Sequence, residues 1–220
     1  MNNITELVFV LDKSGSMRSI ETDTRNGFNE VIEQSRAVAK PNTVFITTTL
    51  FSDKSMILHK HKDIFDVKPL TEKEYSADGS TALYDAVGTT IAFVSNIYKS
   101  LPDDETPSKT ILFMATDGKE NSSERFRCQD VKKLIADKAS KGWTFVYLAT
   151  GIDLEEAKTI GIDKKFAAQF ARNRRGVQSM YQKMVSLSKA AIVNYTADTA
   201  KNNGTLPSNE GWTKTVKGEI

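Results

Sequence analysis

The sequence predicts an α/β fold built on a central, mostly parallel sheet. Short apolar segments rich in β-branched residues alternate with longer segments whose apolar residues recur at helical spacing. That alternation is typical of a parallel sheet covered by helices on both faces. The chain has 220 residues, of which 39% are hydrophobic and 26% are charged. This is the size and composition of one folded domain, with or without a short appendage.

The first half of the chain predicts three strands and one long helix. Residues 5–11 are almost all apolar or β-branched, as in a strand that is buried on both faces. Residues 18–39 carry apolar side chains at near-helical spacing, and Pro41 ends that helix. Residues 43–51 are the most β-prone segment. A turn then leads to residues 55–60, which we expect to form a short antiparallel strand at the edge of the sheet.

The second half continues the alternation. An apolar stripe predicts a helix over residues 81–100, and residues 109–115 predict another buried strand. A helix is expected over 128–141, where Gly142 is placed to end it in a left-handed cap. Four further elements follow: a fifth strand, a short helix, a weak sixth strand and a last helix, over residues 143–149, 153–160, 164–168 and 177–195.

These elements predict one domain over residues 1–195, followed by a polar C-terminal extension over residues 196–220. Trp212 is the only aromatic side chain of the extension. Two interpretations of it stand side by side. Trp212 either anchors the extension onto the domain or a neighbouring copy, or belongs to a flexible tail.

Charge and composition exclude several classes of function. The chain has 30 Lys and Arg against 28 Asp and Glu, a net charge of +2, which gives no support to nucleic acid or a membrane as partner. The single cysteine, Cys128, excludes an intrachain disulfide, and with only two histidines the composition argues against a zinc site. No apolar run is long enough to span a bilayer, and the N-terminus does not resemble a signal peptide. We therefore expect a cytoplasmic protein.

Oxygen-bearing side chains lie where predicted strands end. Asp12, Ser14 and Ser16 alternate directly after the first strand, and Asp117 follows the strand over 109–115. If those strands are neighbours, the two carboxylates face each other at one sheet edge and repel unless a cation lies between them. The hydroxyl of Thr81, at a helix start, would supply a further ligand for that cation from a third loop. Donors of this kind suit magnesium, manganese or calcium.

Each of these residues also has an ordinary interpretation. Asp12 and Ser14 could cap the helix that follows them, and Thr81 could be a plain N-cap. Asp117 and Gly118 together are most often a turn. The occurrence of all three motifs, each at a strand end or helix start, is what favours the metal site.

The motifs occur in the order Asp12-x-Ser14-x-Ser16, Gly79-Ser80-Thr81 and Thr116-Asp117-Gly118. In this order and spacing, residues 1–195 resemble the von Willebrand factor A (vWA) domain with its metal-ion-dependent adhesion site. The local sequence around these motifs resembles that of the intracellular single-domain vWA proteins of bacteria and phages. The resemblance implies a Rossmann-like six-stranded sheet of order 3-2-1-4-5-6 with strand three antiparallel.

The resemblance also implies a role for each motif residue. Ser14, Ser16 and Thr81 would reach Mg²⁺, or Mn²⁺, through their hydroxyl oxygens. Asp12 and Asp117 would mostly hold water molecules bound to the metal. One position on the metal would then remain for water or for an Asp or Glu of a partner protein.

We therefore expect a non-enzymatic, metal-dependent protein–protein binding module. Its rim would be formed by Met17, Ser80, Lys119 and Glu120. Two alternatives stay open: a metal-assisted hydrolase, with Asp117 or Glu120 as general base, and a structural subunit whose metal only stabilises the fold.

Two other groups of residues have ordinary explanations. His59 and His61 alternate with lysines and are expected to be solvated on the edge strand. Arg172, Arg174 and Arg175 form a small basic cluster before the last helix. Most such clusters are solvated loops, and a minority bind phosphate or an acidic partner.

Overall fold

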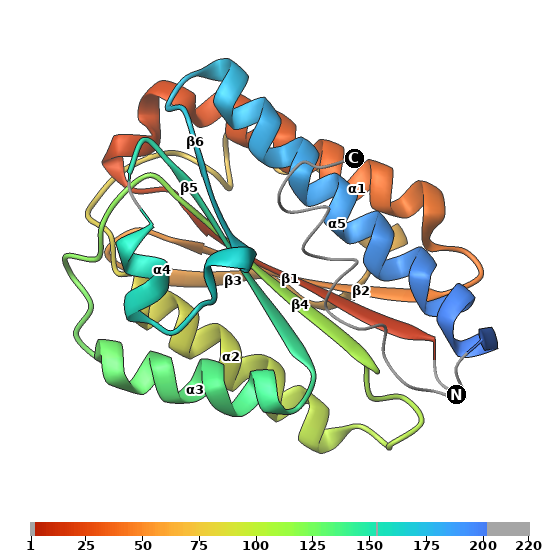
Figure 1. Ribbon diagram of the computed structural model, residues 1–220. Helices are drawn as coiled ribbons and strands as arrows, with labels where there is room; N and C mark the ends of the chain where they lie inside the picture. The colour runs from red at the N-terminus through yellow and green to blue at the C-terminus, as the bar shows by residue number, and fades with distance from the viewer. Residues whose placement is uncertain (1–2, 153, 202–220) are drawn as a thin grey trace.

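A six-stranded sheet runs through the molecule in the order β3-β2-β1-β4-β5-β6 (Figure 1). The computed structural model describes residues 3–152 and 154–201. Every neighbouring pair of strands is parallel except β2 and β3. The predicted strand order and the antiparallel third strand are therefore confirmed. The strands are β1 (Ile4–Asp12), β2 (Thr43–Phe51), β3 (Ser55–Asp63), β4 (Lys109–Thr116), β5 (Trp143–Thr150) and β6 (Ala167–Phe170).

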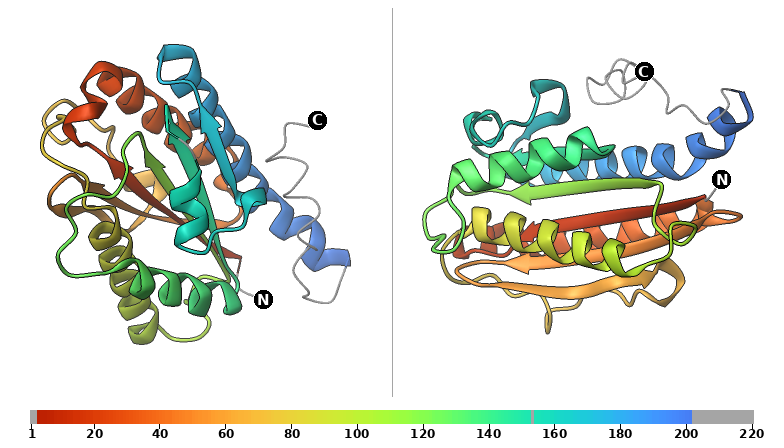
Figure 2. Two further views of the ribbon diagram at one scale, coloured as in Figure 1. Left: turned by 60° about the vertical axis from the view of Figure 1, so that its left-hand side comes forward. Right: turned by 90° about the horizontal axis from the view of Figure 1, so that it is seen from below.

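Helices cover both faces of this sheet (Figures 1 and 2). One face carries α1 (Glu21–Ala39) and α5 (Arg174–Lys201), which pack against each other. The other face carries α2 (Leu83–Ser100), α3 (Cys128–Ser140) and the short α4 (Glu155–Thr159). Within the described residues, no helix is both long and apolar enough to cross a membrane.

The central strand β1 is buried on both faces. Leu7, Phe9 and Leu11 belong to the core beneath α1 and α5, whereas Val8 and Val10 belong to the core beneath α2 and α3. This alternation follows from the period-two geometry of a strand. Two layers of helices therefore fix the position of β1, and its last residue is held at the end of the sheet.

Strands β1 and β4 are in register, with Leu11 beside Ala115. The residues that follow, Asp12 and Thr116, therefore lie side by side where the two parallel strands end. Asp12 is also paired with Phe51 of β2. The loops that leave these three strand ends build the candidate site.

Several predicted boundaries differ from the structure. The helix expected from residue 18 begins as a 3₁₀ helix, η1 (Gly15–Ile20), before α1. The sixth strand lies at Ala167–Phe170 instead of 164–168, because Asp163 accepts a hydrogen bond from the Lys165 amide and starts a 3₁₀ turn, η3 (Lys164–Phe166). The last helix continues to Lys201, so the expected domain boundary between residues 195 and 196 falls inside α5. Trp212 lies outside the described residues.

The edge strand β3 corrects one prediction. His59 is buried at 8% exposure, its Nδ1 lies 3.0 Å from Thr48 Oγ1, and its ring is parallel to that of Phe28 in α1. His61 is half-buried and pairs with the fully buried carboxylate of Glu6. The expectation of two solvated histidines is wrong, because α1 extends over this edge of the sheet and Glu6 provides a buried partner.

Candidate metal centre

The first part of the site is the turn that follows β1. Asp12 is fully buried, and its Oδ1 accepts a hydrogen bond of 2.7 Å from the Ser14 amide. Such a bond from a backbone amide two residues on turns the chain sharply at the end of the strand. The hydroxyl of Tyr75 donates to the carbonyl oxygen of Asp12 and holds the backbone of the turn in place.

The second carboxylate oxygen of Asp12 is held by β4. Thr116 Oγ1 donates a hydrogen bond of 2.6 Å to Asp12 Oδ2. The same hydroxyl accepts from the Gly118 amide at 3.1 Å, so it also shapes the loop that carries Asp117. Both oxygens of Asp12 therefore have protein donors, and its charge faces the site from a fixed position.

Three side-chain oxygens of the site form a continuous chain of contacts. Ser14 Oγ lies 3.1 Å from Ser16 Oγ, which donates a hydrogen bond of 2.6 Å to Asp117 Oδ1. Ser14 is the N-cap residue of η1, but its side chain makes no capping hydrogen bond. The alternative that Ser14 simply caps the following helix is therefore not realised in this structure.

Thr81 approaches from the third loop. A Cβ added at Gly118 would lie 2.9 Å from Thr81 Oγ1, so the absence of a side chain at Gly118 lets this hydroxyl come close to the Asp117 loop. Asn121 fixes the backbone of Thr81 with two hydrogen bonds, of 2.8 and 3.0 Å. The N-cap of α2 is Ala82, without a side-chain cap, so Thr81 does not serve as a plain N-cap either.

Backbone hydrogen bonds join the loops to one another. The Gly15 amide donates to Gly79 O at 2.9 Å, and the Asp78 amide donates to Lys13 O at 2.9 Å. Gly79 has φ +78°, and a Cβ there would lie 2.7 Å from Asp53 Oδ1. A residue with a side chain would be strained and crowded at this position. The five predicted metal-site residues are therefore brought together on loops that hold each other in place.

The two carboxylates of the site, Asp12 and Asp117, are buried, and burial raises the pKa of each. Burial raises the pKa of Asp12 to about 6, and the nearby charge of Asp117 adds to this rise. Burial also raises the pKa of Asp117, while the hydrogen bond from Ser16 and the charge of Arg172 oppose that rise. A bound cation would offset the cost of charging both groups.

Asp117 Oδ2 has an incompletely satisfied environment. It lies 3.0 Å from a guanidinium nitrogen of Arg172, yet this buried oxygen receives no hydrogen bond of acceptable geometry. We interpret the contact as a charge pair that leaves a lone pair of Oδ2 unused. A buried acceptor without a donor is costly, and a cation is one way to satisfy it.

The donor set fits a hard divalent cation. The described residues contain no group of three or more His, Cys, Asp or Glu side chains that could hold a metal. The candidate centre instead combines two carboxylates with the hydroxyls of Ser14, Ser16 and Thr81. Oxygen donors without nitrogen or sulfur favour Mg²⁺ or Mn²⁺ over softer metals.

The predicted rim is only partly found at the surface. Lys119 is exposed and Ser80 is half-buried. Met17, in contrast, is 1% exposed and belongs to the core beneath α1, so it is not available to a partner in this structure. The chain turns through η1 at this point, and its apolar side chain points into the core. Glu120 is half-buried and accepts hydrogen bonds from the amides of Tyr84, Ser122 and Ser123, so it organises its own loop.

Arg172 is a site residue that the sequence analysis missed. It follows β6, and its guanidinium contacts the carbonyl oxygen of Ser16 as well as Asp117. The basic cluster was the only sequence signal for it, and that cluster predicted a solvated loop. Arg172 is 55 residues from Asp117 in the sequence, and only the packing of β6 beside β5 brings the two together.

The fold of this chain is similar to that of several proteins of known structure. The sequence matches no known family model and no curated protein, but several solved structures are similar. A von Willebrand factor type A protein from Catenulispora acidiphila has a TM-score of 0.59 at 13% identity, over 84% of this chain and 43% of that one. The pilus adhesin SpaC from Lactobacillus rhamnosus GG has a TM-score of 0.66 at 13% identity, over 87% of this chain and 30% of that one.

A third similar structure contains a metal. Proximal thread matrix protein 1 from the mussel byssus, with zinc in its MIDAS motif, has a TM-score of 0.57 at 17% identity, over 84% of this chain and 46% of that one. The chain therefore has a vWA-type, Rossmann-like fold. At these identities the likeness is one of fold alone, and this chain spans less than half the length of each of the three proteins.

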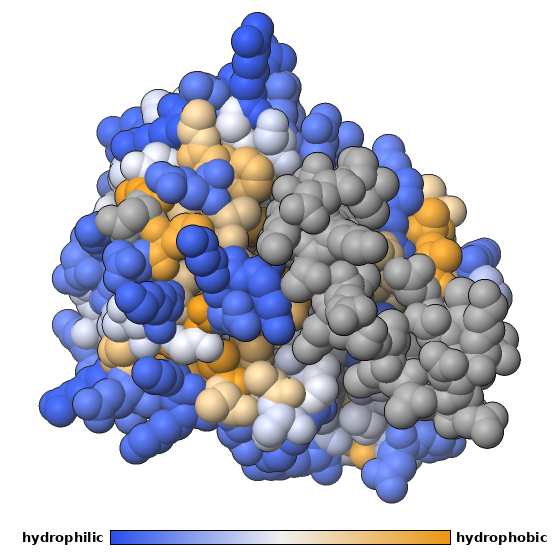
Figure 3. Space-filling view, viewed as in Figure 1, coloured by the Kyte–Doolittle hydropathy of each residue, from blue (hydrophilic) through white to orange (hydrophobic). Residues whose placement is uncertain are grey.

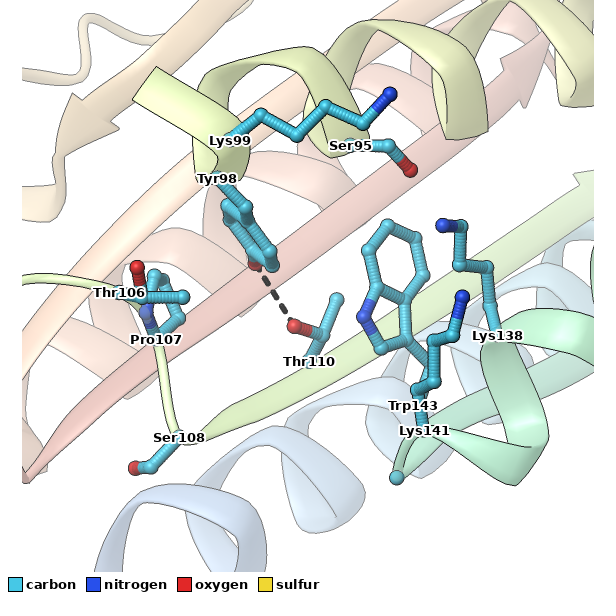
Figure 4. Close-up of a pocket in the computed structure, with 11 residues that line it drawn as sticks. Ser95, Tyr98, Lys99, Thr106, Pro107, Ser108, Thr110, Lys138, Lys141 and Trp143 are labelled. Carbon is cyan, nitrogen blue, oxygen red and sulfur yellow. Dashed lines mark hydrogen bonds between the residues drawn. The ribbon is translucent and has the colours of Figure 1, made fainter. Parts of the chain in front are cut away.

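A hollow of about 350 Å³ lies at the end of the sheet opposite to the candidate metal centre (Figure 4). It is lined by the ends of α2 and α3 and by Trp143, and Tyr98 is hydrogen-bonded to Thr110 within it at 2.8 Å. Of its lysines, Lys138 and Lys141 both pair with Asp137, at 3.3 and 2.8 Å. Thr110 begins β4 and Thr116 ends it, so this hollow is separate from the metal centre.

Proposed function

We propose that this chain is a binding module that recognises a protein partner through a divalent metal, Mg²⁺ or Mn²⁺. The residues that would hold the metal, directly or through water, are Asp12, Ser14, Ser16, Thr81 and Asp117. When bound, the metal would supply an electrophilic centre that accepts a carboxylate oxygen from Asp or Glu of the partner. The observation that carries the proposal is the buried pair of Asp12 and Asp117 beside two serine hydroxyls, with Asp117 Oδ2 held only by the charge of Arg172.

The scarcity of carboxylates supports a partner-completed centre. Asp12 and Asp117 are the two buried carboxylates of the motif loops, whereas Asp78 is exposed and lies 3.9 Å from Arg18, and Glu120 is engaged by its own loop. A metal held mainly by neutral hydroxyls keeps a strong attraction for an incoming anion. The similar structures include a pilus adhesin and a byssus matrix protein, which makes an adhesion-type role a reasonable model for this chain. A cytoplasmic location remains part of the proposal.

Among the described residues, few large apolar side chains are exposed to compete with the metal centre for a partner. Figure 3 shows one face on which hydrophilic residues predominate and apolar residues are interspersed. The large apolar side chains exposed among the described residues are Met56, Phe65 and Val193, at 48%, 47% and 44%. Met56 lies near the start of β3 and Phe65 just beyond its end, so the exposed apolar side chains do not form one continuous patch, and recognition through the metal centre is favoured.

A metal-assisted hydrolase is the second candidate and is less well supported. Such an enzyme needs a general base within hydrogen-bond reach of the attacking water. Glu120 accepts three backbone hydrogen bonds and a fourth from the Ser123 hydroxyl at 2.8 Å, which leaves it poorly placed to accept a proton. Asp117 is paired with Ser16 and Arg172.

A peptide-display selection tests the binding proposal. Immobilised protein is challenged with a random peptide library in Mg²⁺ and, separately, in chelator. We expect enrichment only in Mg²⁺, and we expect each enriched peptide to depend on one Asp or Glu. Thr81→Ala should lose this binding, whereas the matched Thr81→Ser, which keeps the hydroxyl, should retain it. Equal binding of peptides in which Asp is replaced by Asn would contradict the proposal.

A further inference from the structure

Arg172 already places a positive charge at the candidate metal centre. Its guanidinium nitrogen lies 3.0 Å from Asp117 Oδ2 and also contacts the carbonyl oxygen of Ser16. The side chain of Arg172 is 40% exposed, whereas that of Asp117 is fully buried. The guanidinium therefore covers a carboxylate that water cannot reach.

The stem of Arg172 is held by the backbone beneath it. A Cβ added at Gly151 would lie 2.8 Å from Arg172 Cβ and 3.2 Å from its Cδ, and Gly151 has φ +73°. The Gly151 amide donates to Phe170 O at 2.9 Å, which ties the end of β5 to the end of β6. The close approach is possible only because Gly151 lacks a side chain. Arg172 is thus positioned by packing, and not merely by attraction to Asp117.

This position creates a conflict with a divalent cation. Asp117 is one of the residues that would hold the metal, and its Oδ2 is the oxygen that Arg172 contacts. A metal and a guanidinium within a few ångströms of one carboxylate repel each other, and the repulsion is strong where water is excluded. A nearby charge shifts proton binding to a carboxylate by about 1–3 pKa units, and it should act on metal binding in the same way.

We propose that Arg172 is the internal counter-ion of the metal-free centre and that it competes with the divalent metal for Asp117. This inference rests on the proposed metal-binding function and adds a residue that regulates the affinity of the site for metal. Arg172 therefore lowers the affinity for metal and stabilises the protein when metal is absent.

The neighbouring Arg174 offers a matched control. Its Nε lies 3.6 Å from Asp23 Oδ1, and its side chain is 78% exposed. Removing its charge changes the net charge of the protein by the same amount without touching Asp117. Any difference between the two variants therefore reports on the contact at the metal centre.

The test is a Mn²⁺ titration, by calorimetry or electron paramagnetic resonance, of wild type, Arg172→Gln, Arg172→Lys and Arg174→Gln. We expect Arg172→Gln to bind Mn²⁺ about tenfold more tightly or better, since one competing charge is removed. Its metal-free melting temperature should fall. Arg174→Gln should bind as wild type does, and Arg172→Lys, which keeps the charge, should gain less than Arg172→Gln. Affinity in Arg172→Gln that equals or falls below that of wild type would overturn the proposal.

A measurement on the wild type covers the case in which a variant fails to fold. The Nε–Hε resonance of Arg172 should shift and exchange faster with water when Mg²⁺ is added, while that of Arg174 stays unchanged. An unmoved Arg172 resonance at saturating Mg²⁺ would refute the competition. Absence of metal binding in wild type and Arg172→Gln alike refutes the proposed function and this inference together. Metal binding that does not depend on Arg172 refutes this inference alone.

Discussion

Asp12 is the residue on which the chemistry of the centre most depends. Its carboxylate is fully buried at the junction of β1 and β4, and both of its oxygens accept hydrogen bonds. Burial nevertheless dominates and raises its pKa to about 6 from the ordinary 3.8. The metal-free protein therefore carries a carboxylate that ionises only as the pH rises through about 6.

This gives a pH-dependent metal response. Because the folded pKa of Asp12 lies above the unfolded one, its contribution to stability is fully present below about pH 3.8 and is lost as the pH rises through about 6. The loss amounts to about 3 kcal/mol at most, at 1.36 kcal/mol per pKa unit. A metal favours the ionised form, so Mg²⁺ should raise the melting temperature more at pH 7.5 than at pH 5. We expect Asp12→Asn to flatten the pH dependence of the metal-free melting temperature, and a dependence identical to that of wild type would disprove the role of Asp12.

Part of the site could be predicted from single residues. Asp12, Ser14, Ser16 and Asp117 directly follow β-prone segments, and parallel strands bring such residues to one edge of a sheet. Arg172 could not be predicted, since no local pattern records which carboxylate a distant arginine reaches. Met17, which we expected at the rim, lies in the core because the 3₁₀ turn η1 directs its side chain inward.

At the scale of elements, the joint between α1 and α5 is tightly packed. A Cβ added at Gly27 would lie 2.2 Å from Tyr181 Cδ2 and 2.9 Å from Tyr181 Cβ. The two helices can therefore approach each other only because position 27 has no side chain. Tyr181 is itself 1% exposed and has no room to move outward.

Gly27→Ala should therefore destabilise the protein, although alanine is a better helix former than glycine. Overpacking costs about 1–3 kcal/mol, against a gain of about 1 kcal/mol in helix propensity. Because the added Cβ would lie only 2.2 Å from a ring atom of Tyr181, we expect the upper end of that cost and a net loss of about 2 kcal/mol in the free energy of unfolding by chemical denaturation. Asn26→Ala, at the exposed neighbouring position, serves as control and should change stability little. A Gly27→Ala protein as stable as wild type would show that α5 can shift away from α1.

Most elements could be predicted because their apolar patterns are strong. The strands over 43–51 and 109–115 were predicted to within one residue, and Gly142, with φ +88°, confirms the left-handed end of α3. The sixth strand was placed too early because it has only four residues and its start depends on a side-chain cap at Asp163. The burial of His59 was missed because it comes from α1, which is distant in the sequence.

At the scale of the whole molecule, the sheet order brings the loops of the site together. Strands β1 and β4 are adjacent although about 100 residues separate them, and this adjacency puts Thr116 within 2.6 Å of Asp12. The alternation of strands and helices predicted the class of fold, whereas the strand order followed only from the resemblance to vWA domains. The observed order confirms it.

The most direct test of the metal centre compares the calorimetric binding of Mn²⁺ to wild type and to Ser14→Ala/Ser16→Ala. Both hydroxyls lie on the chain of oxygens that ends at Asp117, and neither makes a helix-capping hydrogen bond. The double variant should therefore remain folded. We expect one Mn²⁺ site in wild type and a stabilisation of about 2.7 kcal/mol at a hundredfold excess over the dissociation constant. We expect the variant to lose both, and undiminished Mn²⁺ binding by Ser14→Ala/Ser16→Ala would contradict the proposed metal centre.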